Sequence, residues 1–288
     1  MRFCVIEMVQ DNEVSDFLAR VSSVLYDKEA EYSLMLGLCE GMAKTKPASS
    51  PILINVKKNN RTVAAAIQTP PMNLVISSME QGELVELARY LKKMGASFPG
   101  VVGPAKASEL FAKIWSELMN QQVQLGMGQK IYKLEKVIEP KSDDGDFRPA
   151  NKNDFKIVMD WIIAFAKESL PPSDQRGEEH WKSFAERAVS NQTAHLWLVN
   201  NQAVSIAFCS RPTKNGISIN GVYTPPSERK KGYASAVVAK LSQKMLDSGK
   251  QFCVLYTDLS NPTSNKIYQK IGYREVADSK HFIFTPLS

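Results

Sequence analysis

The order of predicted helices and strands repeats once along the 288 residues, and this repeat limits the possible folds more than any other feature. Apolar residues at helical spacing predict two helices between Asn12 and Ala43, and a three-strand run follows them. A helix, a strand, a helix and a closing strand complete the first half. The second half shows the same order, which predicts a tandem duplication of one α/β unit.

A predicted hairpin opens the strand run of each half, at Asn59 and Asn60 in the first and at Asn200 and Asn201 in the second. The predicted single strands lie at 51–59, 61–69, 72–79, 99–104, 122–137, 216–224, 251–259 and 273–284, and the hairpin of the second half lies at 194–212. After the opening pair, the predicted helices lie at 82–95, 107–120, 152–170, 177–190, 231–249 and 263–272.

The repeat also extends to single residues. The stretches "SELFAKIW" and "NKIYQKIG" both follow a short strand and a turn that contains proline. Phe111 corresponds to Tyr268, and Lys113 corresponds to Lys270 at the same separation in sequence. Together with the element order, this match supports the duplication.

The segment "IEPKSDDGDFRPANKND" interrupts the pattern because it is rich in Pro, Asp, Lys and Gly. We expect the domain boundary within it, which gives a first domain at 1–140 and a second at 144–288. Asn153 or Asp154 is the expected cap of the helix that follows.

The composition, with 43% hydrophobic and 23% charged residues, is that of an ordinary globular protein. The net charge of +6 suits an anionic ligand, a phosphate or a nucleic acid without choosing among them. There is no run of eighteen apolar residues and no signal-peptide pattern, so we expect a cytoplasmic protein that does not bind membranes. The four cysteines lie far apart in or beside apolar stretches, which predicts buried free thiols: Cys4, Cys39, Cys209 and Cys253.

The stretch "NGVYTPPSERKKGYASAVVAKL", residues 220–241, places a basic cluster where a predicted strand gives way to a helix. A helix amino terminus offers unpaired N–H groups and the positive end of its dipole, which together can bind an anion. Gly232 allows a bulky anion to approach the backbone, and Ala234 keeps the next turn small. Three basic side chains add positive charge beside this turn, Arg229, Lys230 and Lys231. The stretch therefore predicts a pyrophosphate site, with a merely solubilising helix start as the alternative.

The pattern Arg229-x-x-Gly232-x-Ala234 resembles the Q/R-x-x-G-x-G/A acyl-CoA signature of the GNAT superfamily of N-acetyltransferases. The downstream stretch "LYTDLSNPTSNKIYQKIGY" is similar to that family's next strand and helix. The resemblance covers about residues 144–286, and the first half looks like a divergent copy, as in tandem-GNAT proteins. It implies an α/β fold of two tandem GNAT-like domains, each with a mixed, mostly antiparallel central sheet flanked by helices.

The resemblance implies that an acetyl group moves from acetyl-CoA to a primary amine by direct attack in a ternary complex. By matching positions, the backbone of Val222, Tyr223 and Thr224 would hold the pantetheine arm on a strand that splays from its neighbour. A backbone N–H near Val222 would stabilise the oxyanion. The N–H groups expected to bind the pyrophosphate belong to Lys230, Lys231, Gly232, Tyr233, Ala234 and Ser235.

Tyr268 matches the family's residue that donates a proton or a hydrogen bond to the departing CoA thiolate. A phenol with a pKa near 10 protonates a thiol with a pKa near 8.5 at a cost of about 2 kcal/mol, so hydrogen bonding is expected to matter more than full transfer. Asn265 is expected to bond the pantetheine or a carbonyl, and Asn261 the strand edge. Turn and cap roles are the alternatives for both asparagines.

The sequence does not identify a general base for the amine. The candidates by residue type are Glu168, Asp174, Glu178, Glu179 and Asp258. The three histidines share no spacing, so no metal site is predicted: His180, His195 and His281.

The first half lacks the signature. Its helix "GELVELARYLKK" begins with acidic residues, so a pyrophosphate would meet Glu83 and Glu86, and Phe111 replaces the hydroxyl of Tyr268. We therefore expect that this half binds no acyl-CoA and packs against the active half.

Two other functional classes are considered. A catalytically silent CoA-binding sensor or interaction module would keep Gly232 and Ala234 but would not need Tyr268. A nucleic-acid binder is suggested by charge alone and is disfavoured because aromatic residues are not interleaved with the basic ones. The predicted partners are acetyl-CoA and an amine acceptor. The acceptor's identity and the choice between monomer and homodimer stay open.

Overall fold

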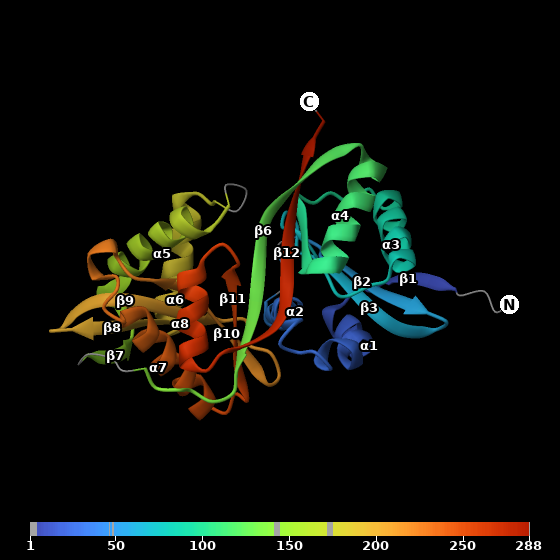
Figure 1. Cartoon of the computed structure of the whole chain (residues 1–288). Helices are drawn as coiled ribbons and strands as arrows, with labels where there is room; N and C mark the ends of the chain where they lie inside the picture. The colour runs from blue at the N-terminus through green and yellow to red at the C-terminus, as the bar shows by residue number, and fades with distance from the viewer. Residues whose placement is uncertain (1–4, 46, 48, 141–144, 172–174, 288) are drawn as a thin grey trace. The chain divides into compact units, whose positions relative to one another are not determined.

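The computed structural model describes residues 5–45, 47, 49–140, 145–171 and 175–287 (Figure 1). Within them each half has the order strand, two helices, three strands, helix, strand, helix and strand, with two short 3₁₀ turns added in the second half. The duplicated α/β order that the sequence predicts is therefore present.

The ten elements of the first half begin with a strand that the sequence analysis did not predict. They are β1 (Ile6–Gln10), α1 (Val14–Tyr26), α2 (Ser33–Lys44), β2 (Ile52–Lys58), β3 (Arg61–Gln68), β4 (Leu74–Ile76), α3 (Gln81–Lys93), β5 (Gly100–Pro104), α4 (Ala105–Met119) and β6 (Gln121–Leu134).

The second half also begins with an unpredicted strand. Its elements are β7 (Asp146–Pro149), η1 (Lys152–Asp154), α5 (Phe155–Ser169), α6 (Glu178–Ser190), β8 (Ala194–Val199), β9 (Gln202–Ser210), β10 (Gly216–Tyr223), η3 (Pro226–Glu228), α7 (Tyr233–Asp247), β11 (Phe252–Asp258), α8 (Pro262–Ile271) and β12 (Arg274–Pro286). The two unpredicted strands, β1 and β7, lie at the two ends of the strand order. Each pairs with only one neighbouring strand, and the apolar pattern in its sequence is weak.

The chain folds into two compact units. The first unit contains the described residues up to Ile131, together with Asp258–Ser260 and the residues from Val276 onward. The second unit contains the described residues of 132–257 and 261–275. These units differ from the predicted domains because β12 joins the first unit from Val276 onward, and the end of β6 joins the second unit from Tyr132 onward.

The strand order shows where the two closing strands lie. In the first unit the order is β1-β2-β3-β4-β5-β12-β6, so the last strand of the chain lies beside β5. In the second unit the end of β6 lies beside β11, and the order continues β11-β10-β9-β8-β7. The pairs β4–β5 and β10–β11 are parallel, and the other registered pairs are antiparallel.

Strand β12 completes the first unit both in its ladder and in its core. Ser279 pairs with Pro104 and Ile283 with Gly100 in the antiparallel register. The N–H of Phe284 donates to the carbonyl of Pro99 at 2.8 Å, and its ring lies 6.0 Å from that of Phe98 in an edge-on arrangement. The predicted ranges 1–140 and 144–288 therefore each leave out a strand that the corresponding compact unit contains.

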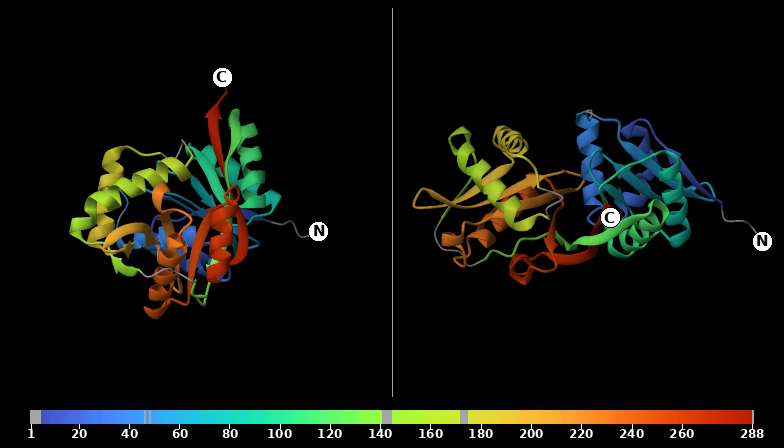
Figure 2. Two further views of the ribbon diagram at one scale, coloured as in Figure 1. Left: turned by 60° about the vertical axis from the view of Figure 1, so that its left-hand side comes forward. Right: turned by 90° about the horizontal axis from the view of Figure 1, so that it is seen from above.

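Side chains of the first unit's sheet alternate between two helical layers, as the strand period of two requires. On β3, Ala64 and Ala66 pack in the cluster with α3 and α4, whereas Ala65 and Ile67 pack with α1 and α2. The two helix pairs therefore cover opposite faces of this sheet (Figure 2).

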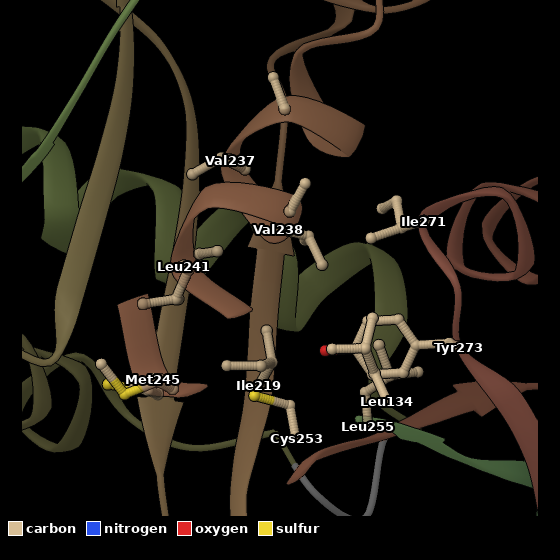
Figure 3. Close-up of a cluster of buried hydrophobic side chains, with 14 of the residues drawn as sticks. Leu134, Ile219, Val237, Val238, Leu241, Met245, Cys253, Leu255, Ile271 and Tyr273 are labelled. Carbon is tan, nitrogen blue, oxygen red and sulfur yellow. The ribbon is translucent and has the colours of Figure 1, made fainter. Parts of the chain in front are cut away.

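The second unit repeats this arrangement. On β9, Ile206 and Phe208 pack in the cluster with α5 and α6. Ala207 and Cys209 face the other way, into the cluster that contains α7. Figure 3 shows part of that second cluster, in which Val237, Val238 and Leu241 of α7 lie over strand and α8 residues.

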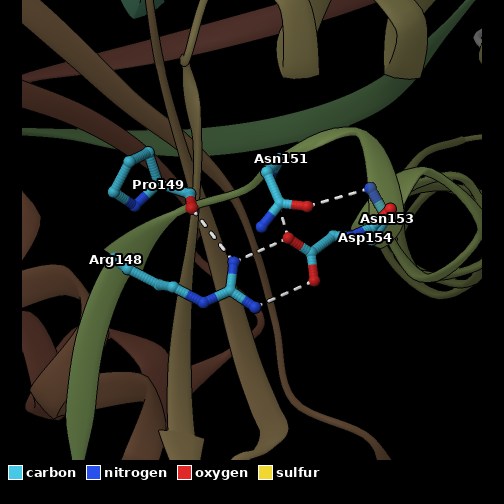
Figure 4. Close-up of polar contacts among 5 residues, drawn as sticks. All are labelled: Arg148, Pro149, Asn151, Asn153 and Asp154. Atoms are coloured by element: carbon cyan, nitrogen blue, oxygen red, sulfur yellow. Dashed lines mark hydrogen bonds and ion pairs between the residues drawn. The ribbon is translucent and has the colours of Figure 1, made fainter.

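The link from β7 to α5 is fixed by the polar cluster in Figure 4. Arg148 donates to both carboxylate oxygens of Asp154, at 2.6 and 3.0 Å, and these bonds lower the pKa of Asp154. The N–H of Asn151 donates to Asp154, and Asn151 in turn accepts from the N–H of Asn153 at 2.9 Å. Asp154 is the N-cap residue of α5, one of the two that the sequence predicted, but its side chain forms no capping bond to that helix. The side chain that caps is Asn151, at the start of the preceding 3₁₀ turn.

Candidate functional site

Strands β10 and β11 separate partway along their length within the second unit. Their parallel register joins Gly216 with Phe252, Ile217 with Cys253 and Ser218 with Val254. No further pair joins the two strands, although β10 continues to Tyr223 and β11 to Asp258. The divergence opens beside Val222, Tyr223 and Thr224, as expected of the strand that precedes the signature.

A β-bulge lies on β10 where the strands have separated. The register with β9 shifts between Asn220 and Tyr223, so Gly221 and Val222 have no paired residue on either neighbouring strand. Gly221 has a φ of +58°, and a Cβ there would lie 2.6 Å from the ring of Phe208. Backbone conformation and space therefore both require glycine at this bulge.

The turn between β10 and α7 presents open backbone donors. Lys230 and Gly232 have positive φ values of 63° and 84°, and α7 begins at Tyr233. The N–H of Ala236 is the first to bond back into the helix, to the carbonyl of Gly232 at 3.0 Å. Among the described residues, no backbone carbonyl accepts from the N–H groups of 230–235. A Cβ on Gly232 would meet nothing within 4 Å, so the space beside these groups is open.

Two of the three basic side chains are engaged with carboxylates. The Arg229 guanidinium donates to Glu168 at 2.7 and 3.1 Å and to the carbonyl of Thr224 at 2.9 Å. Lys231 pairs with Glu228 at 3.0 Å, and Lys230 is exposed without an ion pair to any described residue. Arg229 thus holds the strand end to the turn, and the positive field at the turn comes from the N–H groups and Lys230.

Tyr223 anchors the end of β10. Its buried ring lies 6.2 Å from that of Trp161, and the guanidinium of Arg229 lies 5.7 Å from the ring centre. Ser205 donates to the Tyr223 carbonyl at 3.2 Å and contacts the Thr224 hydroxyl at 2.9 Å. The side chain of Tyr233 is buried in the α7 cluster, so only its backbone N–H can face a ligand.

Tyr268 lies on α8, half-buried against the α7 cluster, with its ring 6.0 Å from that of Tyr273. Loss of water around the hydroxyl raises the pKa of Tyr268 to about 12. Proton transfer to a thiolate whose thiol has a pKa near 8.5 would then cost about 5 kcal/mol. A hydrogen bond from this hydroxyl is therefore favoured over full transfer even more strongly than the sequence suggested.

The two asparagines connect the end of β11 to α8. Asn265 accepts from the Thr257 hydroxyl and donates from Nδ2 to the Asn261 carbonyl at 2.9 Å. The backbone N–H of Asn265 donates to the same carbonyl at 3.3 Å. These contacts are those of turn residues, and they fix α8, and with it Tyr268, against β11.

The candidate bases do not gather around one point in the described residues. Glu168 is held by Arg229, Glu178 and Glu179 lie in the exposed first turn of α6, and Asp258 accepts from the N–H of Ser260. Asp174 lies outside the described residues.

The described cysteines are buried free thiols, as predicted. Burial raises the pKa of Cys39 and of Cys253 to about 12 and raises that of Cys209, which makes all three poor nucleophiles. Cys4 lies outside the described residues. Over the described part of the chain, no group of three or more metal-binding side chains occurs, and no helix is long and apolar enough to cross a membrane.

The corresponding place in the first unit is occupied by protein atoms. Glu80 and Glu83 form a capping box at the start of α3, with the Glu80 N–H donating to Glu83 at 2.9 Å. The carbonyl of Ile76 lies 2.5 Å from the position that a Cβ on Gly103 would take. Strands β4 and β5 therefore remain adjacent as far as Ile76, the last residue of β4. Glu83 blocks the helix start as expected, whereas Glu86 pairs with Arg89 instead.

Several contributors to this site were missed in the sequence analysis. They are the bulge glycine Gly221; Ser205, whose hydroxyl donates to the Tyr223 carbonyl; Glu168, which positions Arg229; and Thr257, which donates to Asn265. Only Gly221 carried a sequence signal, because a glycine inside a strand pattern suggests a bulge. The other three act through contacts between distant segments.

Residues 196–283 match the family model described as FR47-like protein. No sequence among the curated proteins matches the chain.

Solved structures match over almost the whole length. A Drosophila protein has 10% identity and a TM-score of 0.66, with 99% of this chain and 100% of that chain covered. A GCN5-related N-acetyltransferase from Sphaerobacter thermophilus has 12% identity and a TM-score of 0.64, covering 98% and 97%. A tandem GNAT protein from the clavulanic acid biosynthesis pathway has 9% identity and a TM-score of 0.54, covering 98% of each chain. The chain therefore has the tandem GNAT acetyltransferase fold over its whole length, with an FR47-like segment in its second half.

Proposed function

We propose that the second unit binds acetyl-CoA and transfers the acetyl group to a primary amine by direct attack. The main support is one observation: the open N–H groups of residues 230–235 lie next to the diverging ends of β10 and β11 in the same unit. An anion site joined to a strand opening suits a ligand with a pyrophosphate at one end and an extended arm at the other.

The residues of this unit fit such a ligand. The N–H groups from Lys230 to Ser235 would hold the pyrophosphate, and the positive φ and open space at Gly232 leave room for it. The backbone of Val222, Tyr223 and Thr224 would line the pantetheine arm. Acetyl-CoA supplies the activated acetyl thioester.

The chain's own groups would then stabilise charge. The N–H of Val222 lies in the bulge, outside both strand registers, and would donate to the oxygen that becomes negative during attack. Tyr268 would donate a hydrogen bond to the departing sulfur. Asn261 and Asn265 keep α8 in place for this contact. Because the described thiols are buried and have raised pKa values, an acyl-enzyme is not invoked.

The first unit is proposed to bind no acyl-CoA. Its helix start is filled by the side chains of Glu80 and Glu83, and its parallel strands do not open beside Gly103. Calorimetry on the full chain should therefore give one acetyl-CoA site. Two sites per chain would contradict this assignment.

The variant Gly232→Asp tests the pyrophosphate site. It places a carboxylate beside the N–H groups, so acetyl-CoA binding measured by calorimetry should weaken at least about 100-fold through charge repulsion and lost hydrogen bonds. Gly249→Asp is the matched control, because Gly249 also has a positive φ, +98°, and open space around it, at the opposite end of α7. Unchanged binding in Gly232→Asp, or equal losses in both variants, would contradict the site.

A further inference from the structure

Helix α5 supports two neighbouring parts of the proposed acetyl-CoA site. Cδ1 of Ile162 lies 3.5 Å from the position that a Cβ on Gly221 would take, at the bulge of β10. The ring of Trp161 lies 6.2 Å from that of Tyr223, at the end of the same strand. Adjacent residues of one helix therefore contact both the bulge and the strand end.

Near its carboxyl end, α5 also contacts the turn that precedes α7. One Nη atom of Arg229 donates to both carboxylate oxygens of Glu168, at 2.7 and 3.1 Å. Nε of the same guanidinium donates to the carbonyl of Thr224 at 2.9 Å. Glu168 follows Trp161 by seven residues, or about two helical turns, so the two side chains lie on the same side of α5. A single guanidinium therefore joins the helix, the strand end and the turn.

Tyr223 completes this cluster. The guanidinium of Arg229 lies 5.7 Å from the centre of its ring. Burial raises the pKa of the Tyr223 hydroxyl, and Glu168 and Arg229 act on that pKa in opposite directions through charge and hydrogen bonding. A carboxylate, a carbonyl and an aromatic ring thus surround the Arg229 guanidinium together.

These contacts limit what the charge of Arg229 can contribute. A carboxylate at 2.7 Å offsets much of the positive field that this guanidinium would add at the turn. The side chains of Arg229 and Glu168 are 43% and 46% exposed, and ion pairs at such exposure add little to the free energy of folding. A role in positioning accounts for all the contacts of Arg229, whereas phosphate binding or fold stability alone does not.

We propose that Glu168 is a positioning residue for acetyl-CoA, which acts through Arg229 to hold the turn before α7 in a fixed place relative to the bulge. The inference rests on the proposed function and concerns the same site. Acetyl-CoA would span both places, with its pyrophosphate on the turn and its arm along β10. A fixed separation lowers the ordering cost of binding the whole ligand but matters little to a ligand that occupies the turn alone.

The test compares acetyl-CoA with ADP, which carries a pyrophosphate but no pantetheine arm. Both are titrated by calorimetry into full-length protein. In Glu168→Gln the dissociation constant of acetyl-CoA should rise about 3- to 10-fold, and that of ADP should change less than about twofold. Asp160→Asn is the matched control and should change neither constant. It removes a carboxylate of the same helix that pairs with Lys156 at 2.7 Å and is 52% exposed.

Two results of this titration would overturn the proposal. Equal weakening of ADP and acetyl-CoA in Glu168→Gln would show that the separation between turn and strand is not what Glu168 controls. Unchanged or tighter binding of acetyl-CoA would show that Glu168 is dispensable or competes with the pyrophosphate for Arg229.

Arg229→Lys separates position from charge. Lysine keeps the positive charge, but one ammonium group replaces the separate Nε and Nη donors. The dissociation constant of acetyl-CoA should therefore rise at least as much as in Glu168→Gln. The double variant should bind within about twofold of Arg229→Lys alone, because both changes break the same contact. Wild-type affinity in Arg229→Lys, or losses that multiply in the double variant, would contradict the proposal.

Turnover distinguishes this role from that of a general base. With a reactive amine and both substrates saturating, Glu168→Gln should keep kcat within about threefold of wild type. The reason is that the bulge beside Val222 packs on Phe208 and Ile162 and not on Glu168. A loss of about 100-fold in kcat with unchanged acetyl-CoA affinity would make Glu168 the base and overturn the proposal.

A failure of the proposed function itself has a different signature. If wild-type protein binds no acetyl-CoA, the positioning contact is tested in the free protein by hydrogen exchange at Glu228 and Arg229, whose N–H groups donate to the carbonyls of Pro225 and Pro226. Faster exchange in Glu168→Gln but not in Asp160→Asn supports the contact without any ligand. Equal exchange in wild type and Glu168→Gln contradicts it.

Discussion

Tyr268 and Phe111 occupy corresponding positions in the two halves, and they differ by one hydroxyl group. Phe111 is fully buried in its cluster, where a ring is all that packing needs. Tyr268 also has a ring contact, edge-on with Tyr273 at 6.0 Å, but as a residue it stays half-buried. Removing the hydroxyl of Tyr268 therefore tests the proposed catalytic role and keeps the ring that packs.

Tyr268→Phe should lower kcat about 100-fold and leave the acetyl-CoA dissociation constant within about twofold of wild type, because the ring is kept and the hydrogen bond is lost. With a pKa of about 12, Tyr268 should give no alkaline limb in the kcat profile below about pH 11. Tyr273→Phe is the control. It loses the 2.8 Å contact with Ser242, so stability should fall by about 1 kcal/mol while turnover is kept. Wild-type turnover in Tyr268→Phe would remove this residue from the mechanism.

We expect His195 to make the second unit sensitive to acid. It is 0% exposed and stacks on Phe147 at 5.2 Å, and burial together with the charge of Lys244 lowers the pKa of His195 to about 4. The unfolded chain binds a proton near pH 6.5, whereas the folded chain does not until near pH 4. Stability is therefore complete above pH 6.5 and falls as the pH drops toward 4.

The expected loss from His195 is about 3 kcal/mol between these two pH values. Denaturant unfolding of His195→Phe, which cannot titrate, should show a flatter pH dependence than wild type over that interval. His180→Phe is the comparison, because His180 lies on the exposed start of α6. An equal pH slope in wild type and His195→Phe would show that this histidine does not control acid stability.

At the residue scale the sequence was informative where chemistry depends on a local pattern. The spacing of Arg229, Gly232 and Ala234 correctly located the turn before α7, because this turn is contiguous in sequence. The engagement of Arg229 with Glu168 could not be predicted, since it joins residues from separate helical and turn segments. Whether the predicted residues bind acetyl-CoA stays a prediction until ligand binding is measured.

At the scale of elements, the helices and the interior strands could be predicted from the periodic spacing of apolar residues. The edge strands β1 and β7 could not be predicted in this way, because they are short and pair on one side only. The insertion of β12 between β5 and β6 could not be predicted from the local sequence either. The sequence of β12 reads as an ordinary closing strand, whereas its pairing with β5 and the contact of Phe284 with Phe98 join segments far apart in sequence.

Phe284→Ala should open the first unit even though it changes the end of the chain. Phe284 is 7% exposed in the first unit's core, so the cost should be about 3–5 kcal/mol. Hydrogen exchange should speed up in β5, at Gly100–Pro104, more than in β8 or β9. Val276→Ala on the same strand is the control, since Val276 is 43% exposed and should have little effect. Faster exchange confined to the second unit would contradict the strand exchange.

At the scale of the whole molecule, the two sequence copies are not the two folding units. A fragment of residues 1–140 lacks β12, and a fragment of 144–288 lacks β6. Each fragment expressed alone should therefore expose an unpaired strand edge and an incomplete core, giving no cooperative melting transition. Co-expression of both fragments supplies the two missing strands and should restore a soluble complex. A sharp transition in either fragment alone would show that its own half is sufficient.

The place of β12 in the first unit also sets the timing of biosynthesis. Domains usually fold in order as they leave the ribosome, with the amino-terminal one first. Here the first unit has to wait for β12 to be translated, since β5 gains its second neighbouring strand only when residues 279–283 have emerged. Nascent chains halted before that point would hold an open β5 edge for most of synthesis, so premature termination late in the message leaves the earliest-made part of the protein unfinished.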